Sequence, residues 1–296
     1  MIIPPLAAQS GTGTKVRALL SCLKERFAEA GVDSPGLDAR LILAMVLGCE
    51  GAHLHAHPEK VVSAEELARV GSLAKRRMAR EPMAYISGER EFWSTSFLVS
   101  PDVLIPRPES ELLVERAAAL LGKGGKSKVL DVGCGSGAVG LAIASELHEV
   151  RITLLDLCPK ALGVARRNAE RLGFESRTSL LASDLFEALA RGEEFDLIAS
   201  NPPYVATGEL DGLMPEVSSF EPRLALDGGV DGMDLIRRII EEAPGYLVRG
   251  GFLLIEMDPR QMAEAETLSV QRGSYRAARR HKDLAGRERV LGLKRA

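Results

Sequence analysis

The segment Asn201-Pro202-Pro203-Tyr204 follows residues 195–200, an apolar run that is typical of a buried strand. The nitrogen of an amide or an aromatic amine is a poor nucleophile because its lone pair is delocalised. Two acceptors on its two N–H bonds would direct that lone pair towards a methyl donor, and this turn offers the Asn201 side-chain oxygen and the Pro202 backbone carbonyl. The prolines fix φ and stiffen the geometry, and Tyr204 offers an aromatic wall for a planar group. We therefore interpret this turn as a site that promotes methyl transfer by placement and electrostatics. The alternative is a proline-rich loop whose tyrosine is only a packing residue.

A second segment, Gly133-Cys134-Gly135-Ser136-Gly137, joins a strand-like run to a helical run. Its glycines permit a tight turn and a close approach of backbone to a ligand, and the N–H groups of the following helix point at that ligand. With the alanine that follows it, the segment also satisfies the G-x-G-x-x-A form of the dinucleotide fingerprint. Taken alone, the segment is therefore compatible both with a dinucleotide site and with a purely structural turn.

Acidic residues stand at or just after the ends of three successive predicted strands, at Asp131, Asp156 and Asp184. Open α/β sheets bind ligands at this carboxyl edge. Asp156 comes 19 residues after Gly137, where an acidic side chain can accept hydrogen bonds from ribose hydroxyls. An acidic rim suits a cofactor with a sulfonium and an ammonium group better than a pyrophosphate. The three aspartates therefore favour S-adenosylmethionine over NAD.

The elements that must position these residues divide the chain into three predicted parts. Residues 1–80 have apolar positions at helical spacing and predict a helical domain. Residues 81–108 predict a β-hairpin followed by prolines, which we interpret as a linker. In residues 109–296 predicted strands alternate with helices, which is typical of βαβ crossovers and a mostly parallel sheet. Two further strands, near 275–281 and 289–293, are expected at its edge.

Composition narrows the class of protein further. The 296 residues are 46% hydrophobic and 27% charged, which are values of a globular protein. A net charge of −3 gives no electrostatic case for a protein that coats nucleic acid. The four cysteines form no C-x-x-C pair, and the alternating His53, His55 and His57, which could line a strand, lack further ligands, so we expect no metal. We expect no signal peptide and no membrane span, and hence a cytoplasmic protein.

The chain resembles the HemK/PrmC type of peptide chain release factor glutamine methyltransferase. The resemblance rests on motifs that recur in order along the chain: Glu81–Gly88, Glu91–Trp93, Leu104–Glu111, Asp131–Gly137, Ser200–Tyr204, Glu221–Leu226 and Lys282–Arg287. It implies a helical substrate-docking domain and a seven-strand, Rossmann-like class I methyltransferase domain that holds S-adenosylmethionine and releases S-adenosylhomocysteine. The implied acceptor is the side-chain amide of the glutamine in the Gly-Gly-Gln motif of class I release factors.

The resemblance also implies roles for individual residues. The segment Gly133, Cys134, Gly135, Ser136 and Gly137 would hold the methionine part of the cofactor, with Asp131 and Asn201 beside it. Asp156 would hold the ribose, and Asp184 and Leu185 would flank the adenine. The target glutamine would lie against Asn201, Pro202, Pro203 and Tyr204, with Arg107 near the entrance. Cys134 and Ser110 stand where the family often has Thr, and Met257-Asp258 replaces a common Ile-Gly.

Several questions stay open at this point. A DNA adenine-N6 methyltransferase shares the Asn-Pro-Pro-Tyr segment but would need a target-recognition domain and a basic groove. A catalytically silent methyltransferase-like binding module is a third possibility, and an NAD-dependent oxidoreductase a distant one. We expect a monomer without a stable nucleic-acid partner. Residues 205–221 hold four acidic residues and no basic one, so we hypothesise that they form a mobile acidic lid over the acceptor site.

Overall fold

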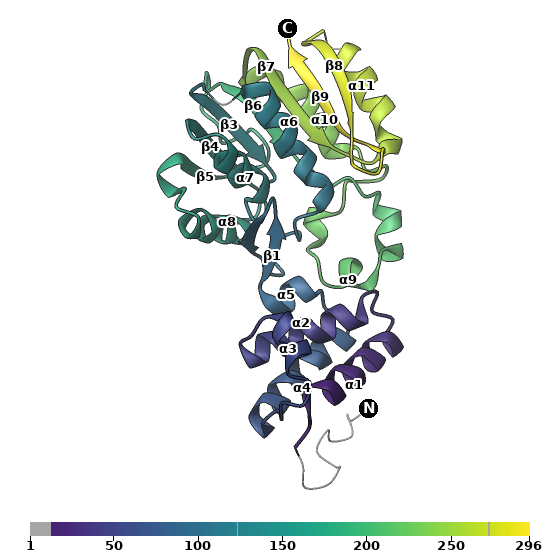
Figure 1. Ribbon diagram of the computed structural model, residues 1–296. Coiled ribbons are helices and arrows are strands. Elements are labelled where there is room, and N and C mark those ends of the chain that lie inside the picture. Colours follow the sequence, from purple (N-terminus) through teal and green to yellow (C-terminus); the bar gives the residue numbers. More distant parts are fainter. Residues whose placement is uncertain (1–12, 123, 272) are drawn as a thin grey trace. The chain divides into compact units, whose positions relative to one another are not determined.

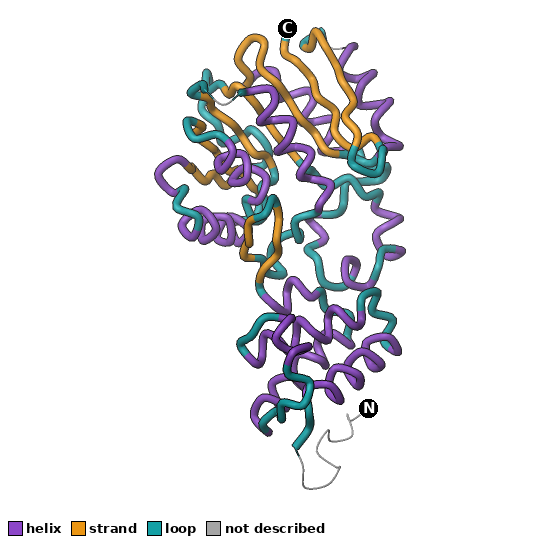
Figure 2. The backbone as a smooth tube through the Cα atoms, viewed as in Figure 1, coloured by secondary structure: helices purple, strands orange, loops and turns teal. Residues whose placement is uncertain are grey.

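The computed structural model describes residues 13–122, 124–271 and 273–296 (Figure 1). Contacts within the chain divide it into two compact units. The smaller unit comprises the described residues up to Gly88 together with Pro215–Phe220. The larger unit comprises Glu89–Met214 and Glu221–Ala296. Figure 2 shows that helices build the first unit, whereas the strands lie in the second.

The smaller unit is helical, as the sequence predicts. Its core comprises buried apolar residues from several helices, such as Leu19, Phe27, Ile42 and Val70. Ser63 and Glu66 form the capping box that their spacing indicates: the Glu66 N–H donates to the Ser63 hydroxyl, and the Ser63 N–H donates to the Glu66 carboxylate. The helices are α1 (Val16–Glu29), α2 (Pro35–Leu47), α3 (Gly51–Ala56), α4 (Ala64–Met78), α5 (Met83–Ser87) and α9 (Pro215–Ser218). The histidines at 53 and 55, which could have lined one face of a strand, lie on the helix α3.

Helix α9 belongs to the smaller unit through an ion cluster, which we define as Asp38, Arg77, Arg80 and Glu216. Arg77 Nε lies 2.7 Å from a carboxylate oxygen of Asp38, and its other nitrogens lie 3.0 Å from Glu216 Oε1. Arg80 contacts both Glu216 oxygens at 2.6 Å. Burial opposes ionisation of Glu216, but the hydrogen bonds from the two arginines outweigh it and lower its pKa. Arg77 of α4 and Arg80, two residues beyond its end, therefore join α4 to α9 and α2.

The larger unit contains a seven-stranded sheet within its described residues, in the order β5-β4-β3-β6-β7-β9-β8. The first five strands in this order are parallel, and β9 is antiparallel to both of its neighbours, β7 and β8. The strands are β3 (Ser127–Val132), β4 (Val150–Asp156), β5 (Thr178–Ala182), β6 (Phe195–Ser200), β7 (Leu247–Glu256), β8 (Tyr275–Lys282) and β9 (Glu288–Arg295). The predicted seven-strand Rossmann-like class is confirmed. Of the two predicted edge strands only β8 is at the edge, because β9 pairs with β7 as well.

Helices cover both faces of this sheet (Figure 1). Side chains alternate between the faces: Val129 of β3 packs in one apolar cluster and Leu130 in the other. The first cluster includes residues of α6 (Glu111–Leu121), α7 (Ala138–Glu146) and α8 (Pro159–Arg171). The second includes residues of α10 (Asp234–Glu242) and α11 (Met262–Gln271). The covered faces leave the carboxyl ends of the parallel strands as the place for a ligand.

The predicted hairpin forms from β1 (Glu89–Phe92) and β2 (Thr95–Leu98). Its two connecting residues, Trp93 and Ser94, have φ values of +50° and +54°, as a two-residue hairpin turn requires. Phe92 and Phe97 pack in the core of the larger unit, and Asn168 of α8 bonds both the N–H and the carbonyl of Leu98. The hairpin is thus part of the larger unit, whereas the sequence predicts a separate linker.

Candidate functional site

A cavity of about 470 Å³ lies in the larger unit, at the carboxyl ends of β3, β4, β5 and β6. Its wall brings together most of the residues that the sequence predicts for the site: Arg107, Asp131, Gly133, Cys134, Gly135, Ser136, Asp156, Asp184, Leu185, Asn201 and Pro203. The wall does not include Gly137, Pro202 or Tyr204. The topology explains the gathering, because parallel strands end at one edge of the sheet.

The glycine turn, residues 133–137, has an open side towards the ligand. Gly133 and Gly135 have φ values of +72° and +54°, and a Cβ added to either would meet no described atom within 4 Å. Two backbone N–H groups of the turn donate to the Leu155 carbonyl at 2.8 and 3.0 Å, which ties the turn to β4. The turn therefore presents bare backbone that a ligand can approach closely.

Asp156 at the end of β4 holds this turn in place. One carboxylate oxygen accepts the Gly135 N–H and the other accepts the Cys158 N–H, both at 2.8 Å. Burial raises the pKa of Asp156, and these two N–H donors oppose the rise. Because each carboxylate oxygen has two lone pairs, Asp156 keeps acceptor capacity for a ligand hydroxyl.

Asp131 and Asp184 differ from each other in burial. Asp131 is 2% exposed and accepts the Gly140 N–H at 2.8 Å. Burial raises the pKa of Asp131 to about 7, opposed by the Gly140 N–H and reinforced by Asp156. Asp184 is partly exposed and lies 2.9 Å from a guanidinium nitrogen of Arg238 on α10. The predicted acidic rim is therefore weakened, by burial that raises the pKa of Asp131 and by the arginine beside Asp184.

The Asn-Pro-Pro-Tyr turn, residues 201–204, follows β6. Asn201 donates from Nδ2 to the Ser110 hydroxyl at 2.9 Å, which leaves its Oδ1 as the acceptor side of the amide. Pro202 is buried. Burial, reinforced by Glu256, raises the pKa of Tyr204 to about 12, so this phenol stays neutral near pH 7.

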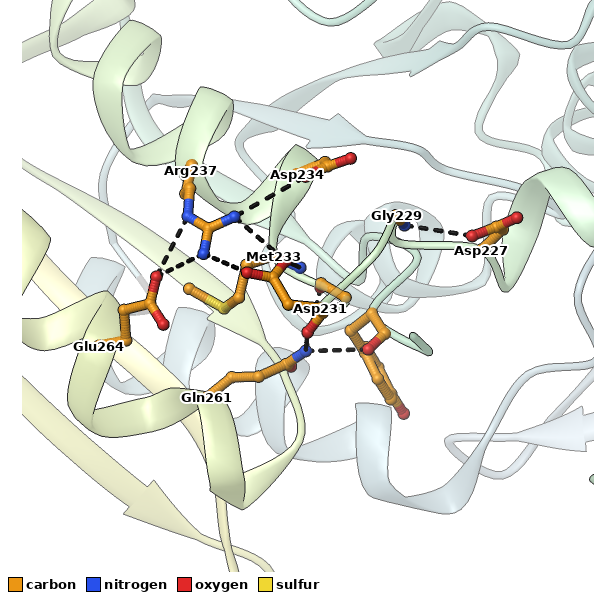
Figure 3. Close-up of polar contacts among 10 residues, drawn as sticks. Asp227, Gly229, Asp231, Met233, Asp234, Arg237, Gln261 and Glu264 are labelled. Carbon is orange, nitrogen blue, oxygen red and sulfur yellow. Dashed lines mark hydrogen bonds and ion pairs between the residues drawn. The ribbon is translucent and has the colours of Figure 1, made fainter. Parts of the chain in front are cut away.

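The backbone of this turn is held from behind by Gln261 (Figure 3). Its Nε2 donates to the carbonyls of Tyr204 at 2.9 Å and Gly232 at 3.0 Å. Gln261 is itself fixed, since it closes a capping box with Asp258 at the start of the short turn before α11. Beside it, Arg237 joins Asp231 to Glu264. The Asn-Pro-Pro-Tyr turn is thus held at Tyr204 by Gln261, the last residue of the short 3-10 turn before α11.

Two family models match the chain: the PrmC N-terminal domain over residues 18–88 and the methyltransferase small domain over residues 108–215. A release factor glutamine methyltransferase of Rhodopirellula baltica is 40% identical, with 95% of this chain and 96% of the relative covered. One of Koribacter versatilis is 42% identical, with 82% and 86% covered. The chain belongs to the release factor glutamine methyltransferase family.

The fold of this family member is also found in more distant structures. The 16S rRNA N2 G1207 methyltransferase RsmC of T. thermophilus, solved with AdoMet and guanosine, has a TM-score of 0.50 and is 19% identical. The alignment covers 70% of this chain and 50% of that one. At this identity the likeness shows the methyltransferase fold alone.

The sequence missed part of the cavity wall of this methyltransferase. The wall also contains residues of two motifs on which the resemblance rests, but to which no site role was given: Leu104, Pro106, Pro222, Leu224 and Ala225. Glu221 joins the two motifs, because Arg107 Nη2 contacts both of its oxygens at 2.7 and 2.8 Å. The prolines of residues 101–108 indicated a linker. Only the resemblance of the motif Leu104–Glu111 to the family could have indicated that these residues line a site.

The acidic side chains of residues 205–221, the hypothesised mobile lid, are mostly paired with arginines. The segment contains a short 3-10 turn at Thr207–Gly212 and helix α9. Glu216 lies in the ion cluster, and Glu209 contacts Arg260 at 2.8 and 3.0 Å. These two carboxylates are already paired with arginines, so they add little net negative charge to attract a basic substrate.

The residues that the structure describes contain no candidate membrane span and no candidate metal site. No helix among them is long and apolar enough to cross a membrane. Within the same ranges no group of three His, Cys, Asp or Glu side chains is placed to hold a metal ion. The four cysteines, all described, are free.

Proposed function

We propose that the protein transfers the methyl group of S-adenosylmethionine to the side-chain nitrogen N5 of the glutamine in the Gly-Gly-Gln motif of class I peptide chain release factors, in support of translation termination. One observation carries the proposal: the Asn201 amide, fixed on its donor side by Ser110, lies in the same cavity wall as the glycine turn. Family membership supplies the class of substrate.

The residues of the cavity fit S-adenosylmethionine. The bare backbone at Gly133 and Gly135 leaves room for the methionine part, where any side chain would fill the space. Asp156 retains lone pairs for the ribose hydroxyls, and Asp184 and Leu185 would flank the adenine. The distant RsmC structure holds AdoMet on the same fold. When bound, this cofactor supplies a methyl group on a positively charged sulfur.

The Asn-Pro-Pro-Tyr turn prepares the acceptor nitrogen. Asn201 Oδ1 and the Pro202 carbonyl accept the two N–H bonds of the target amide and oppose delocalisation of its lone pair. Bound S-adenosylmethionine would supply the methyl group, with the electron pair of the broken C–S bond kept by sulfur in S-adenosylhomocysteine. The target amide would gain the N–C bond and release one proton to water. The raised pKa of Tyr204, about 12, keeps its phenol protonated, so no phenolate is available as a base and its proposed role is to flank the planar amide. Rate enhancement comes from placement and electrostatics.

The smaller unit would dock the release factor, and its match to the PrmC N-terminal domain supports this role. We further propose a monomer that acts in the cytoplasm, where release factors work, without a stable nucleic-acid partner. The near-neutral composition, with a net charge of −3, is in keeping with a protein substrate.

The experiment supplies labelled S-adenosylmethionine with a class I release factor, with the same factor whose motif glutamine is replaced, or with duplex DNA. We expect label on the intact factor alone. Label on DNA would favour an adenine methyltransferase, and label that does not depend on the glutamine would contradict the proposed acceptor. Absence of transfer with retained cofactor binding would indicate a silent binding module.

A further inference from the structure

Two buried polar residues stand behind Asn201, on other elements of the larger unit. Ser110 is 3% exposed and lies at the junction of the short turn Pro108–Ser110 with α6. Glu256 is 1% exposed and is the last residue of β7, the strand next to β6. Ser110 occupies the N-cap position of α6, yet its side chain makes no capping hydrogen bond. A serine at this position usually caps, so its hydroxyl is available for another contact.

The hydroxyl joins Asn201 to Glu256 in one chain of hydrogen bonds. Ser110 Oγ accepts from Asn201 Nδ2 at 2.9 Å, and hydrogen bonding from Ser110 lowers the pKa of the Glu256 carboxyl against the rise that burial causes. The Asn201 amide can donate only from Nδ2, so the Ser110 oxygen accepts from it and the hydroxyl proton is left for the Glu256 carboxyl. This direction places Nδ2 of the amide against Ser110 and turns Oδ1 to the opposite side.

The Glu256 carboxyl is not stabilised as a structural ion pair is. Its Oε2 has no hydrogen-bond partner among the described residues. Arg289 of β9, with Arg107 and Glu109 ahead of α6, faces it electrostatically. A buried carboxyl that is only partly paired lowers the stability of the folded protein. A variant with an apolar residue of similar volume at such a position is often at least as stable. The interaction with Ser110 therefore indicates a functional reason for keeping this carboxyl in spite of its cost in stability.

We propose that Ser110 and Glu256 are positioning residues that hold the Asn201 carboxamide with its oxygen towards the methyl acceptor. The inference rests on the proposed function. A carboxamide turned by half a rotation would present Nδ2, a donor, to the N–H bonds of the target amide. Two donors facing each other form no hydrogen bond, so that rotamer cannot hold the acceptor.

The kinetic test compares Ser110→Ala, which removes the hydroxyl, with Ser110→Thr, which keeps it. We expect kcat on the release factor to fall about 10- to 100-fold in Ser110→Ala, the range that misplacement of a reacting group produces. The dissociation constant for S-adenosylmethionine should stay unchanged, and Ser110→Thr should restore most of kcat. Ser269→Ala is the matched control, because Ser269 is fully buried in α11 and donates to a backbone carbonyl. An equal loss in the control, or full kcat in Ser110→Ala, would overturn the inference.

A second measurement reads the orientation without activity. In ¹⁵N-labelled protein the Asn201 side-chain NH₂ signal, assigned by its loss in Asn201→Ala, should shift and exchange faster with water in Ser110→Ala and Glu256→Leu. In Glu256→Gln, which keeps an acceptor oxygen, the signal should move less. An NH₂ signal that is unchanged in Ser110→Ala contradicts the chain of hydrogen bonds. A wild-type protein that methylates no release factor would instead refute the proposed function, while this measurement still decides the orientation.

Discussion

Two glutamates in the two units show opposite ways of placing a carboxylate away from water. Glu216 in the smaller unit is held by Arg77 and Arg80, and these contacts lower its pKa. Glu256 in the larger unit hydrogen-bonds a neutral hydroxyl, and burial raises its pKa to about 7. The ion cluster satisfies its charges and stabilises a domain. The underpaired carboxyl lies beside Asn201, and perturbed groups of this kind mark functional sites.

The largest effect should come from breaking the ion cluster with Arg77→Ala. The change leaves Asp38 and Glu216 without the arginine that joins them, and removal of one partner from a buried pair costs about 3–5 kcal/mol. Hydrogen exchange of the amides in α1, α2 and α4 measures the loss in the smaller unit itself. The matched control is Arg76→Ala, since Arg76 is half exposed and pairs with Glu81; an exposed pair contributes below about 1 kcal/mol. Equal losses in both variants would contradict a special role for the cluster.

In the larger unit the same kind of truncation should affect rate and leave stability nearly intact. Asn201→Ala removes one of the two acceptors for the target amide, and we expect turnover to fall by about 100-fold or more. Steady-state kinetics with the release factor measure the fall, and thermal unfolding checks that the fold is kept. Turnover close to that of the wild type would contradict the role of Asn201.

The contrast between the glutamates becomes sharper when stability is followed against pH. Glu256 has a pKa of about 7 in the folded protein, above its value in the unfolded chain, so the folded state binds the extra proton. Its contribution is fully present below about pH 4.5 and is lost as the pH rises to about 7, a difference of about 3 kcal/mol at most. Glu256→Gln should flatten this part of the curve and gain stability relative to the wild type at pH 8.

Glu216→Gln is the opposite case. The pKa of Glu216 is lowered in the folded protein, so its contribution is present above the pKa of the unfolded chain and is lost as the pH falls through the folded value. This variant should therefore lose stability at pH 8. Denaturant unfolding at a series of pH values measures both variants, and a change of the same sign in the two at pH 8 would remove the contrast.

The smallest effect is expected at Glu209. This carboxylate pairs with Arg260 on the surface, where solvent screens an ion pair and its contribution to stability is small. Glu209→Gln should leave the free energy of unfolding unchanged. The KM for the release factor should stay within about twofold of the wild-type value. A several-fold rise in KM at low salt would restore the hypothesis of an attracting acidic lid.

Much of the fold follows from the sequence because its signals are local. Periodicity predicts the helices and the alternation of strands, and the glycine turn and the Asn-Pro-Pro-Tyr turn mark two strand ends that do meet in one cavity. The ion cluster could not be predicted, because Arg77 and Glu216 are 139 residues apart and only the folded chain brings them together. A role for Glu256 could not be predicted either, since an acidic residue in an apolar strand gives no sign of its partner.

The most direct test of the account is mass spectrometry of the release-factor peptide that contains the Gly-Gly-Gln motif, after incubation with S-adenosylmethionine and the enzyme. The account predicts one added methyl group on the glutamine side chain with the wild-type protein and, at matched times, almost none with Asn201→Ala. A methyl group on another residue, or equal modification by both proteins, would contradict it.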